Sequence, residues 1–307
     1  MSLQTQTRTA FKPVAGTTAG RSQLYWLIKA MRPRQWTKNL VIFAGIIFSK
    51  NLLEPELLGR AAAAFGLFCL ISGSVYIIND LVDLERDRVH PKKRHRPLAA
   101  GLLSVPAALT AVAFAGGGSL AAAFYLDNLF GLVAAGYFLL VLTYSLWLKN
   151  IVIIDVLTIG MGFILRAVAG AVVISVSISP WLLVCTYLLA LFLALTKRRH
   201  ERLMLEAAHT HRKILREYQP EMLEQMISVV TSSTVMAYSL YTFTAGHSRW
   251  LMATIPFVIY GIFRYQYLVH QKDIGGSPEM ALLKDIPLLV NVALWVVASA
   301  LILYLTK

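Results

Sequence analysis

Charged residues and cysteines are both scarce in this chain of 307 residues. Asp, Glu, Lys and Arg make up 15% of it, against about 25% in an average soluble domain, whereas hydrophobic residues make up 57%. This composition excludes an intrinsically disordered protein and argues against an ordinary soluble enzyme. The two cysteines, Cys69 and Cys185, stand in apolar runs, so the sequence predicts no disulfide framework and no zinc site.

Several patterns that carry chemistry in soluble enzymes are also missing. The histidines form no metal-binding set, no Ser, His and Asp triad can be assembled, and no glycine-rich phosphate loop follows a strand. Residues 1–23 are polar and lack the apolar core of a signal peptide, so we expect a disordered cytoplasmic tail there. We expect residues 24–307 to form a single domain.

Long apolar runs dominate the rest of the chain and predict an all-α, polytopic membrane helix bundle. A helix needs about 20 apolar residues to cross the hydrocarbon core of a bilayer. Runs of this kind predict nine transmembrane helices, near 37–53, 61–82, 98–124, 128–148, 151–174, 180–196, 224–245, 249–268 and 286–306. The first is the weakest, because Lys38 and Lys50 bracket a short run.

Basic residues are distributed unevenly over the ends of these spans. The net charge is +13, and 24 of the 29 Lys and Arg residues fall in the tail and in the loops after the second, fourth, sixth and eighth spans. Membrane proteins concentrate positive residues on their cytoplasmic side. We therefore expect an inner (plasma) membrane protein with its N-terminus and these loops in the cytoplasm. The charge predicts topology rather than a nucleic-acid partner.

The end of the second predicted span carries a set of oxygen ligands. Asn79, Asp83 and Asp87 recur every four residues and Asp80 precedes Asp83 by three, which places them on one helix face. Such a face needs a cation, and hard oxygen ligands suit Mg²⁺, which binds few carboxylates together with substrate phosphates. The motif predicts a magnesium and diphosphate site with the three aspartates as catalytic residues. The alternative is a solvated helix end paired with Arg86 and Arg88.

Basic residues near this motif are candidates for phosphate contacts. They lie in the loop after the second span and at the start of the first span: Lys93, Arg94, Arg96, Arg34 and Lys38. Guanidinium and ammonium groups form charge-assisted hydrogen bonds with phosphate oxygens. The alternatives stay open, since the same residues could serve as topology signals or bind lipid headgroups.

A short loop after the fourth predicted span adds further candidates at the same membrane surface. The loop places Lys149 at that surface, where we expect a catalytic role. Tyr144 and Asp155 flank it and are substrate-binding candidates. Asp155 could equally pair with a cation on another helix, and Tyr144 could belong to the aromatic belt.

The end of the sixth span is basic, and one arginine stands inside the fifth span. Lys197, Arg198 and Glu201 predict an anion site or, alternatively, an ordinary basic helix end that complements the helix dipole. Arg166 lies about three turns beyond Asp155, too far along the helix axis to pair with it. We expect Arg166 to have a structural role or to line a polar cavity.

These residues together resemble the UbiA superfamily of intramembrane prenyltransferases. Asn79-Asp80-x-x-Asp83-x-x-x-Asp87, followed by a basic loop that ends in Arg96-Pro97, is similar to the first aspartate-rich motif of that family. Phe163-x-x-Arg166-x-x-x-Gly170 in the fifth span also fits, and the resemblance runs from about Ala30 to the C-terminus. It implies a UbiA-like helix bundle and a magnesium-dependent transferase.

The chain departs from the general family pattern at one place. Prenyltransferases of the superfamily carry a second Asp-x-x-x-Asp motif after the sixth span, where this chain reads Lys197-Arg198-Arg199-His200-Glu201. This replacement and the opening Arg32-Pro-x-Gln-Trp-x-Lys-Asn39 resemble one branch, the decaprenyl-phosphate phosphoribosyltransferases. That branch implies phosphoribosyl diphosphate as donor, a polyprenyl phosphate as acceptor bound at Lys197 and Arg198, and a product used in cell-envelope synthesis.

Two other functions stay open at this point. The general superfamily reaction would move a prenyl group from a prenyl diphosphate to an aromatic or other small acceptor. A transporter that conducts ions along its acidic face is a third possibility. The deep parts of the sixth to ninth spans carry no acidic residue to continue such a path, which argues against transport. The sequence does not indicate an oligomeric state.

Overall fold

The computed structural model describes residues 22–91, 93–207, 214–244, 249–271 and 278–305, and within these ranges all regular structure is helical. The tail predicted at 1–23 lies outside them except for its last two residues. Ser22 caps the first helix, because its side chain accepts a hydrogen bond from the backbone N–H of Tyr25. Gln23 is the first residue of that helix.

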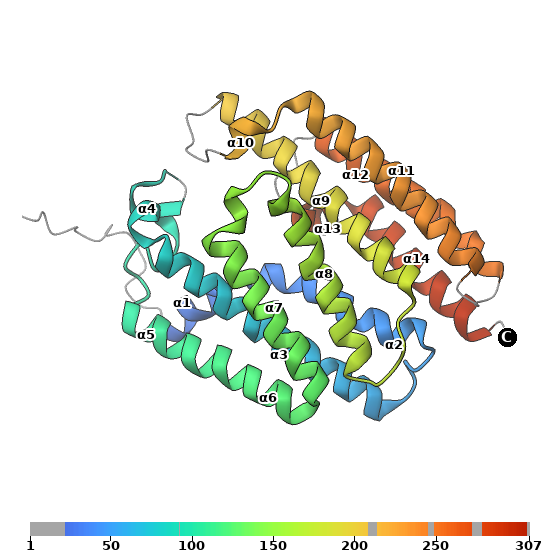
Figure 1. The fold of residues 1–307 in the computed structure, drawn as a ribbon, viewed down its shortest axis with the longest axis horizontal. Coiled ribbons are helices and arrows are strands. Elements are labelled where there is room, and N and C mark those ends of the chain that lie inside the picture. Colours follow the sequence, from blue (N-terminus) through green and yellow to red (C-terminus); the bar gives the residue numbers. More distant parts are fainter. Residues whose placement is uncertain (1–21, 92, 208–213, 245–248, 272–277, 306–307) are drawn as a thin grey trace, which may run out of the picture.

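The helices follow one another as labelled in Figure 1. The shorter elements are α1 (Gln23–Ala30), η1 (Pro33–Phe43), α2 (Ala44–Phe48), α4 (Leu84–Val89), η2 (Lys93–His95), α5 (Val105–Ala111), η3 (Val112–Gly117), α6 (Gly118–Leu126), η4 (Leu148–Asn150), α10 (Ile214–Glu217), η5 (Arg249–Thr254) and α13 (Pro278–Lys284). The longer helices are α3 (Pro55–Val82), α7 (Asn128–Leu146), α8 (Ile154–Val172), α9 (Pro180–Ala207), α11 (Pro220–Thr244), α12 (Ile255–Gln271) and α14 (Ile286–Leu305).

Six helices of the described chain are long and apolar enough to cross a membrane: Pro55–Val82, Val105–Leu126, Asn128–Leu146, Ile154–Val172, Pro180–Leu203 and Ile286–Leu305. They match six of the nine predicted spans, so the chain is a multi-pass integral membrane protein of the predicted all-α class. The number nine is not confirmed. The other three intervals correspond to η1 with α2, to α11, and to η5 with α12, and α12 has only 17 residues.

The first predicted span, 37–53, departs most from expectation. It is a 3-10 helix, η1, that begins at Pro33 and continues into the five-residue α2. The apolar run is short, and Lys50 takes a left-handed backbone conformation with φ of 62° directly after α2. A 3-10 helix rises more per residue than an α-helix, so this short run covers more length than its residue count suggests.

Two large buried hydrophobic clusters hold the bundle together. One lies between η1, α3, α6, α7 and α8 and contains Phe68, Phe130 and Tyr137. The other lies between α8, α9, α11 and α12 and contains Phe192 and Tyr265. Helix α8 contributes to both clusters, so it connects the two halves of the molecule.

Helix α8 also packs against η1 so closely that their backbones are in contact. An added Cβ at Gly170 would stand 1.9 Å from the carbonyl oxygen of Ile42 in η1, so no larger residue fits there. Gly160, nearer the start of α8, leaves room in the same way for the ring of Tyr187 on α9. Glycines of α8 therefore permit close packing against η1 and α9.

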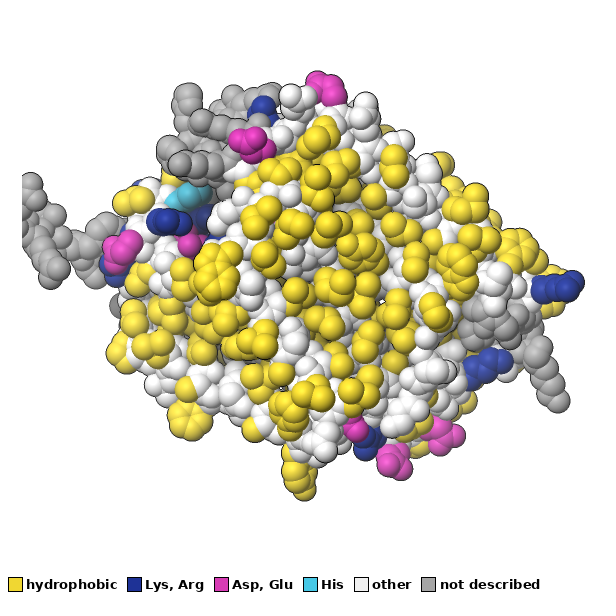
Figure 2. All heavy atoms as spheres, viewed as in Figure 1, with side chains coloured by type: hydrophobic (Ala, Val, Ile, Leu, Met, Phe, Trp, Pro, Cys, Tyr) yellow, Lys and Arg dark blue, Asp and Glu magenta, His cyan; other side chains and the backbone are white. Residues whose placement is uncertain are grey.

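The two ends of the bundle differ in charge from its middle. Figure 1 shows α4 and α10, the short helices that follow α3 and precede α11, at the same end of the molecule. Figure 2 shows hydrophobic side chains across the middle of one face, with charged side chains toward its ends. This distribution suits a bundle whose middle is surrounded by lipid. The end that carries α4 and α10 is called the site end below.

Candidate active site

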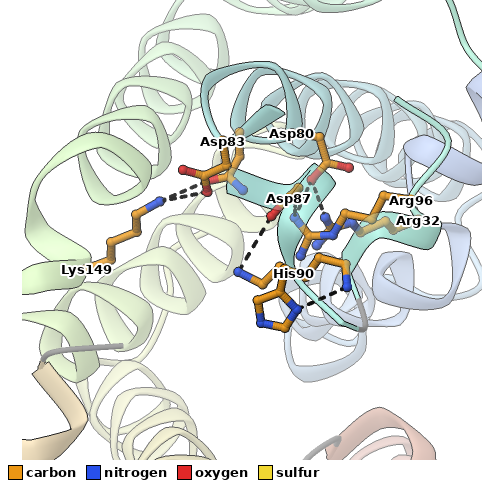
Figure 3. A network of polar contacts seen from close by, with 9 residues as sticks. Arg32, Asp80, Asp83, Asp87, His90, Arg96 and Lys149 are labelled. Carbon is orange, nitrogen blue, oxygen red and sulfur yellow. Dashed lines mark hydrogen bonds and ion pairs between the residues drawn. The ribbon is translucent and has the colours of Figure 1, made fainter. Parts of the chain in front are cut away.

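The acidic motif lies where α3 ends, and the helix does not continue through it. Helix α3 ends at Val82 and α4 begins at Leu84, with Asp83 as the shared cap residue. Asp80 is the last buried residue of α3, and Asp87 is buried on α4. The four predicted ligands are therefore close together, but this junction divides them into two groups that point in different directions (Figure 3).

The first group, here the arginine cluster, consists of Arg32, Asp80, Asp87, Lys93 and Arg96. A single nitrogen of Arg96, Nη1, lies 3.0 Å from an oxygen of Asp80 and 2.5 Å from one of Asp87. Arg32 donates to the same oxygen of Asp80 at 2.6 Å, and Lys93 lies 3.8 Å from Asp87. Both carboxylates are only 2% exposed. Three cations thus surround two buried carboxylates, which leaves a positive excess.

The second group, here the lysine cluster, consists of Asn79, Asp83 and Lys149. The ammonium group of Lys149 donates to the side-chain oxygens of Asn79 and Asp83, at 3.3 Å in each case. Lys149 lies on η4, in the short connection between α7 and α8, and it reaches across to the end of α3 as Figure 3 shows. The loop after the fourth predicted span therefore contacts the acidic motif through Lys149.

The acidic motif fits a metal that shares its ligands with a substrate, not one enclosed by protein. Among the residues that the structure describes, no three His, Cys, Asp or Glu side chains could hold a metal ion together. However, one guanidinium nitrogen already bridges Asp80 and Asp87, so a small cation at that place would reach both carboxylates. Mg²⁺ typically binds one or two carboxylates and completes its shell with waters and phosphates.

A third group, here the Arg198 network, lies where α9 and α8 meet at the site end. Arg198 is 3% exposed and donates from Nε to Asp155 at 2.6 Å, from Nη1 to Glu201 at 2.5 Å and from Nη2 to Tyr144 at 3.1 Å. Every nitrogen of its guanidinium is therefore engaged by a protein oxygen. The network connects four predicted residues, but it holds Arg198 inside the protein instead of presenting it to a ligand.

Tyr218 completes this network from the segment between α10 and α11. Its hydroxyl donates to Asp155 at 2.5 Å and accepts the backbone N–H of Ile153 at 2.7 Å. Ile153 has a φ of 69°, which is unfavourable for a β-branched residue, so this bond fixes a strained turn just before α8. Burial and the hydrogen bond to Asp155 raise the pKa of Tyr218, which keeps its hydroxyl a donor.

Asp155 is fully buried in this network and lies close to the start of α8. Helix α8 begins at Ile154, so Asp155 lies in its first turn. A carboxylate there also interacts favourably with the helix dipole. Asp155 is 0% exposed and its two oxygens are used by Arg198 and Tyr218. Of the two roles left open, the structure favours partner to a cation on another helix.

Arg166 forms a separate buried group in the middle of the bundle. It donates to the side-chain oxygen of Asn39 at 2.8 Å, to the carbonyl of Gly162 at 2.9 Å and to the hydroxyl of Tyr137 at 2.6 Å. Its guanidinium also stacks over the rings of Tyr137 and Phe163, at 4.6 and 5.1 Å from their centroids. These contacts join η1, α7 and α8, which is the structural role expected for it.

Four further predicted residues are Arg34, Arg94, Lys38 and Lys197. Arg34 and Arg94 are exposed, and neither side chain takes part in the three groups above. Lys38 is half-buried on η1, next to Asn39. Lys197 is half-buried on α9, next to Arg198.

Two members of the site were not predicted. Arg32 belongs to the Arg32-Pro motif at the start of the first predicted span, but phosphate contacts were predicted only for Arg34 and Lys38 in that motif. Its left-handed backbone, with φ of 56°, directs it toward Asp80, and it stacks over Tyr76. The signal for it was a basic residue directly before a proline at the start of an apolar run. Tyr218 stands in a charged loop and carries no signal in the sequence.

The model of the UbiA prenyltransferase family matches residues 39–284, which is most of the chain. The chain belongs to this family. Among its relatives are two decaprenyl-phosphate phosphoribosyltransferases. The one from Mycolicibacterium smegmatis is 32% identical over 93% of this chain and 94% of its own length. The one from Corynebacterium glutamicum is 33% identical over 91% and 87%.

The fold agrees with family membership. A UbiA homolog from Archaeoglobus fulgidus, solved with GPP and Mg²⁺ bound, superposes with a TM-score of 0.71 over 91% of this chain and 99% of its own. Its sequence is 20% identical to this one. The predicted UbiA-like bundle is therefore confirmed, although the six helices identified by length and composition do not establish nine spans.

Proposed function

We propose that this protein transfers the 5-phosphoribosyl group of phosphoribosyl diphosphate to a polyprenyl phosphate and releases diphosphate. The observation that carries this proposal is the identity of 32–33% to two decaprenyl-phosphate phosphoribosyltransferases over more than nine tenths of this chain. Lys197, Arg198 and Glu201 stand where prenyltransferases of the superfamily have a second acidic motif, which supports the same pair of substrates.

The acidic motif supports a role in binding the diphosphate with Mg²⁺. Asp80 and Asp87 on one side, and Asp83 with Asn79 on the other, are the residues that would hold the metal. When bound, Mg²⁺ would neutralise charge on the departing diphosphate. Arg32, Arg96 and Lys93 would then donate to its oxygens, because the arginine cluster has more cations than carboxylates.

Lys149 is suited to hold the donor close to the acidic motif. It lies between Asn79 and Asp83, so an anion bound to it is also next to both.

In the reaction, a phosphate oxygen of the acceptor attacks C1 of the ribose, and the bond from C1 to the diphosphate oxygen breaks with its electron pair on the leaving diphosphate. The attacking phosphate is already an anion, so no protein base is needed. Catalysis then rests on positioning and electrostatic stabilisation.

The acceptor phosphate is assigned mainly to Lys197. The sequence suggested Lys197 and Arg198 together, but Arg198 already donates to Asp155, Glu201 and Tyr144. We assign Arg198 to the support of this helix end. Lys197→Met should raise the KM for polyprenyl phosphate about tenfold, the loss of one charge-assisted hydrogen bond, and should leave the KM for phosphoribosyl diphosphate unchanged.

The site end is assigned to the cytoplasm because 24 Lys and Arg residues fall on its side of the predicted topology and four on the other. Single cysteines test this in a background without Cys69 and Cys185. Arg94→Cys lies at the site end and Leu53→Cys before α3, at the other end, and both positions are exposed. In intact cells an impermeant thiol reagent should label only Leu53→Cys. Labelling of Arg94→Cys alone would show that the protein has the opposite orientation in the membrane.

The transfer reaction itself is tested with the purified full-length protein. Labelled phosphoribosyl diphosphate, a polyprenyl phosphate and Mg²⁺ should give a lipid-soluble label, and Asp83→Asn should abolish it. Product from a prenyl diphosphate and an aromatic acceptor, with no use of phosphoribosyl diphosphate, would establish the general prenyl-transfer reaction instead.

A further inference from the structure

A pocket of about 310 Å³ lies beside the lysine cluster, at the site end of the bundle. It is lined by the end of α3 with the start of α4, and by the last turn of α7 with η4. Asp83 and Lys149, the ion pair shown in Figure 3, both belong to its lining. Ligand pockets have volumes of about 300–1,000 Å³, so this pocket suits a group of the size of a sugar phosphate.

One cation of this pocket, Arg86, has no hydrogen-bond or ion-pair partner in the described part of the chain. It lies on α4 and is exposed. The acidic residues near it in sequence all pair with other cations: Asp83 with Lys149, Glu85 with Arg88 and Asp87 with Arg96. A guanidinium that no carboxylate engages can donate two parallel N–H groups to the oxygens of a phosphate.

Two neutral polar side chains of the pocket also lack partners among the described residues. Ser145 is only 8% exposed, and its hydroxyl forms no hydrogen bond there. A serine or threonine inside a helix often donates to the carbonyl four residues before it, as Thr143 does to Leu139 on the same helix. The side-chain amide of Asn150, the last residue of η4, is likewise not engaged in the described chain. Because a buried hydroxyl without a hydrogen bond costs free energy, Ser145 indicates a polar ligand in the pocket.

We propose that this pocket binds the ribose 5-phosphate end of the donor, with Arg86 on the 5-phosphate and Ser145 and Asn150 on the sugar. This rests on the proposed function, and it names the residues that select a phosphorylated sugar. The diphosphate end of the same molecule lies at the arginine and lysine clusters, and Lys149 borders both places. A prenyl diphosphate would bring a hydrocarbon chain to the pocket and leave its guanidinium, hydroxyl and amide without partners. Polar groups that stay unpaired let a site reject an analogue that lacks the matching group.

Inhibition of the full-length enzyme by the two halves of the donor, ribose 5-phosphate and diphosphate, tests this assignment. In Arg86→Gln the inhibition constant of ribose 5-phosphate should rise about tenfold, the loss of one charge-assisted contact. The inhibition constant of diphosphate and the KM for polyprenyl phosphate should not change. Arg88→Gln is the matched control, because it removes the same charge from α4 but at a residue that pairs with Glu85 and does not line the pocket. Asn150→Ala should raise the constant for ribose 5-phosphate about threefold, since it removes a neutral donor.

Thermal unfolding shows whether each variant is folded. A parallel rise of both inhibition constants would mean that Arg86 supports the whole site and not one phosphate. An unchanged constant for ribose 5-phosphate in folded Arg86→Gln and Asn150→Ala would mean that the pocket does not hold this half of the donor, and a selective rise in the KM for polyprenyl phosphate would assign the pocket to a lipid phosphate. Each of these results overturns the assignment while the parent enzyme still uses phosphoribosyl diphosphate. If the parent enzyme makes no product from phosphoribosyl diphosphate, the proposed function fails, and the assignment of the pocket fails with it.

Discussion

Replacing Arg198 with methionine distinguishes a structural role from a phosphate-binding role. Methionine has a similar length and is apolar, so the change removes the charge and the donors with little loss of packing. Asp155, at 0% exposure, would keep a single partner, the hydroxyl of Tyr218. Its unpaired charge would then remain buried at the start of α8. We therefore expect Arg198→Met to unfold much more easily than the parent protein.

The structure sets the size of this effect. Removing one partner of a buried ion pair costs about 3–5 kcal/mol, because the other charge stays buried without compensation. Arg199 is the matched control, because it is the next residue on α9 and pairs with Glu224, whose side chain is 42% exposed. Because Glu224 is open to solvent and Arg199 is 16% exposed, the pair is closer to a surface pair, which contributes about 0–1 kcal/mol. The two neighbouring arginines should thus differ by at least about 2 kcal/mol in their effect on the free energy of unfolding.

Denaturant unfolding of the purified protein in detergent measures both variants. Adding Asp155→Asn to Arg198→Met should restore part of the stability, since the buried charge is removed with its partner. If Arg198→Met lost transfer activity at parental stability, Arg198 would be a direct ligand of the acceptor phosphate, and our assignment would be wrong.

Three further changes probe the other groups. Asp87→Ala should abolish transfer, whereas Glu85→Ala, whose side chain is 81% exposed, should keep it; activity of both variants in excess Mg²⁺ decides this. Tyr218→Phe should lower the free energy of unfolding by about 1–3 kcal/mol, because the N–H of Ile153 loses its acceptor, and an unchanged unfolding midpoint would contradict that. Lys149→Met should raise the KM for phosphoribosyl diphosphate, and a selective rise in the KM for the lipid would assign Lys149 to the acceptor instead.

The acidic motif shows what spacing alone can predict. Intervals of three and four residues correctly brought Asp80, Asp83 and Asp87 to one region, because a helical repeat depends only on local geometry. They did not predict that the chain turns at Asp83, so that Asp83 faces Lys149 while Asp80 and Asp87 face Arg96. The choice of partner depends on segments 9 to 66 residues away in sequence, whose path only the folded bundle determines.

The Arg198 network shows what local spacing could not predict. The sequence suggested a basic helix end for phosphate, because Lys197 and Arg198 stand where the family has carboxylates. It could not reveal that Asp155 and Tyr218 arrive from two other segments and occupy this guanidinium. The span count was uncertain for a related reason: apolar composition predicts which segments are buried in lipid or protein, but it does not separate short helices such as α12 from full spans.

The pairing of charges in the arginine and lysine clusters has a thermodynamic consequence. Each carboxylate of the motif is already neutralised by Arg32, Arg96, Lys93 or Lys149. A metal that bound alone would leave these cations without partners, and a diphosphate that bound alone would leave the carboxylates without theirs. Only when both arrive does every displaced group find an opposite charge. The affinities of Mg²⁺ and diphosphate should therefore be coupled, each raising the other by the same factor.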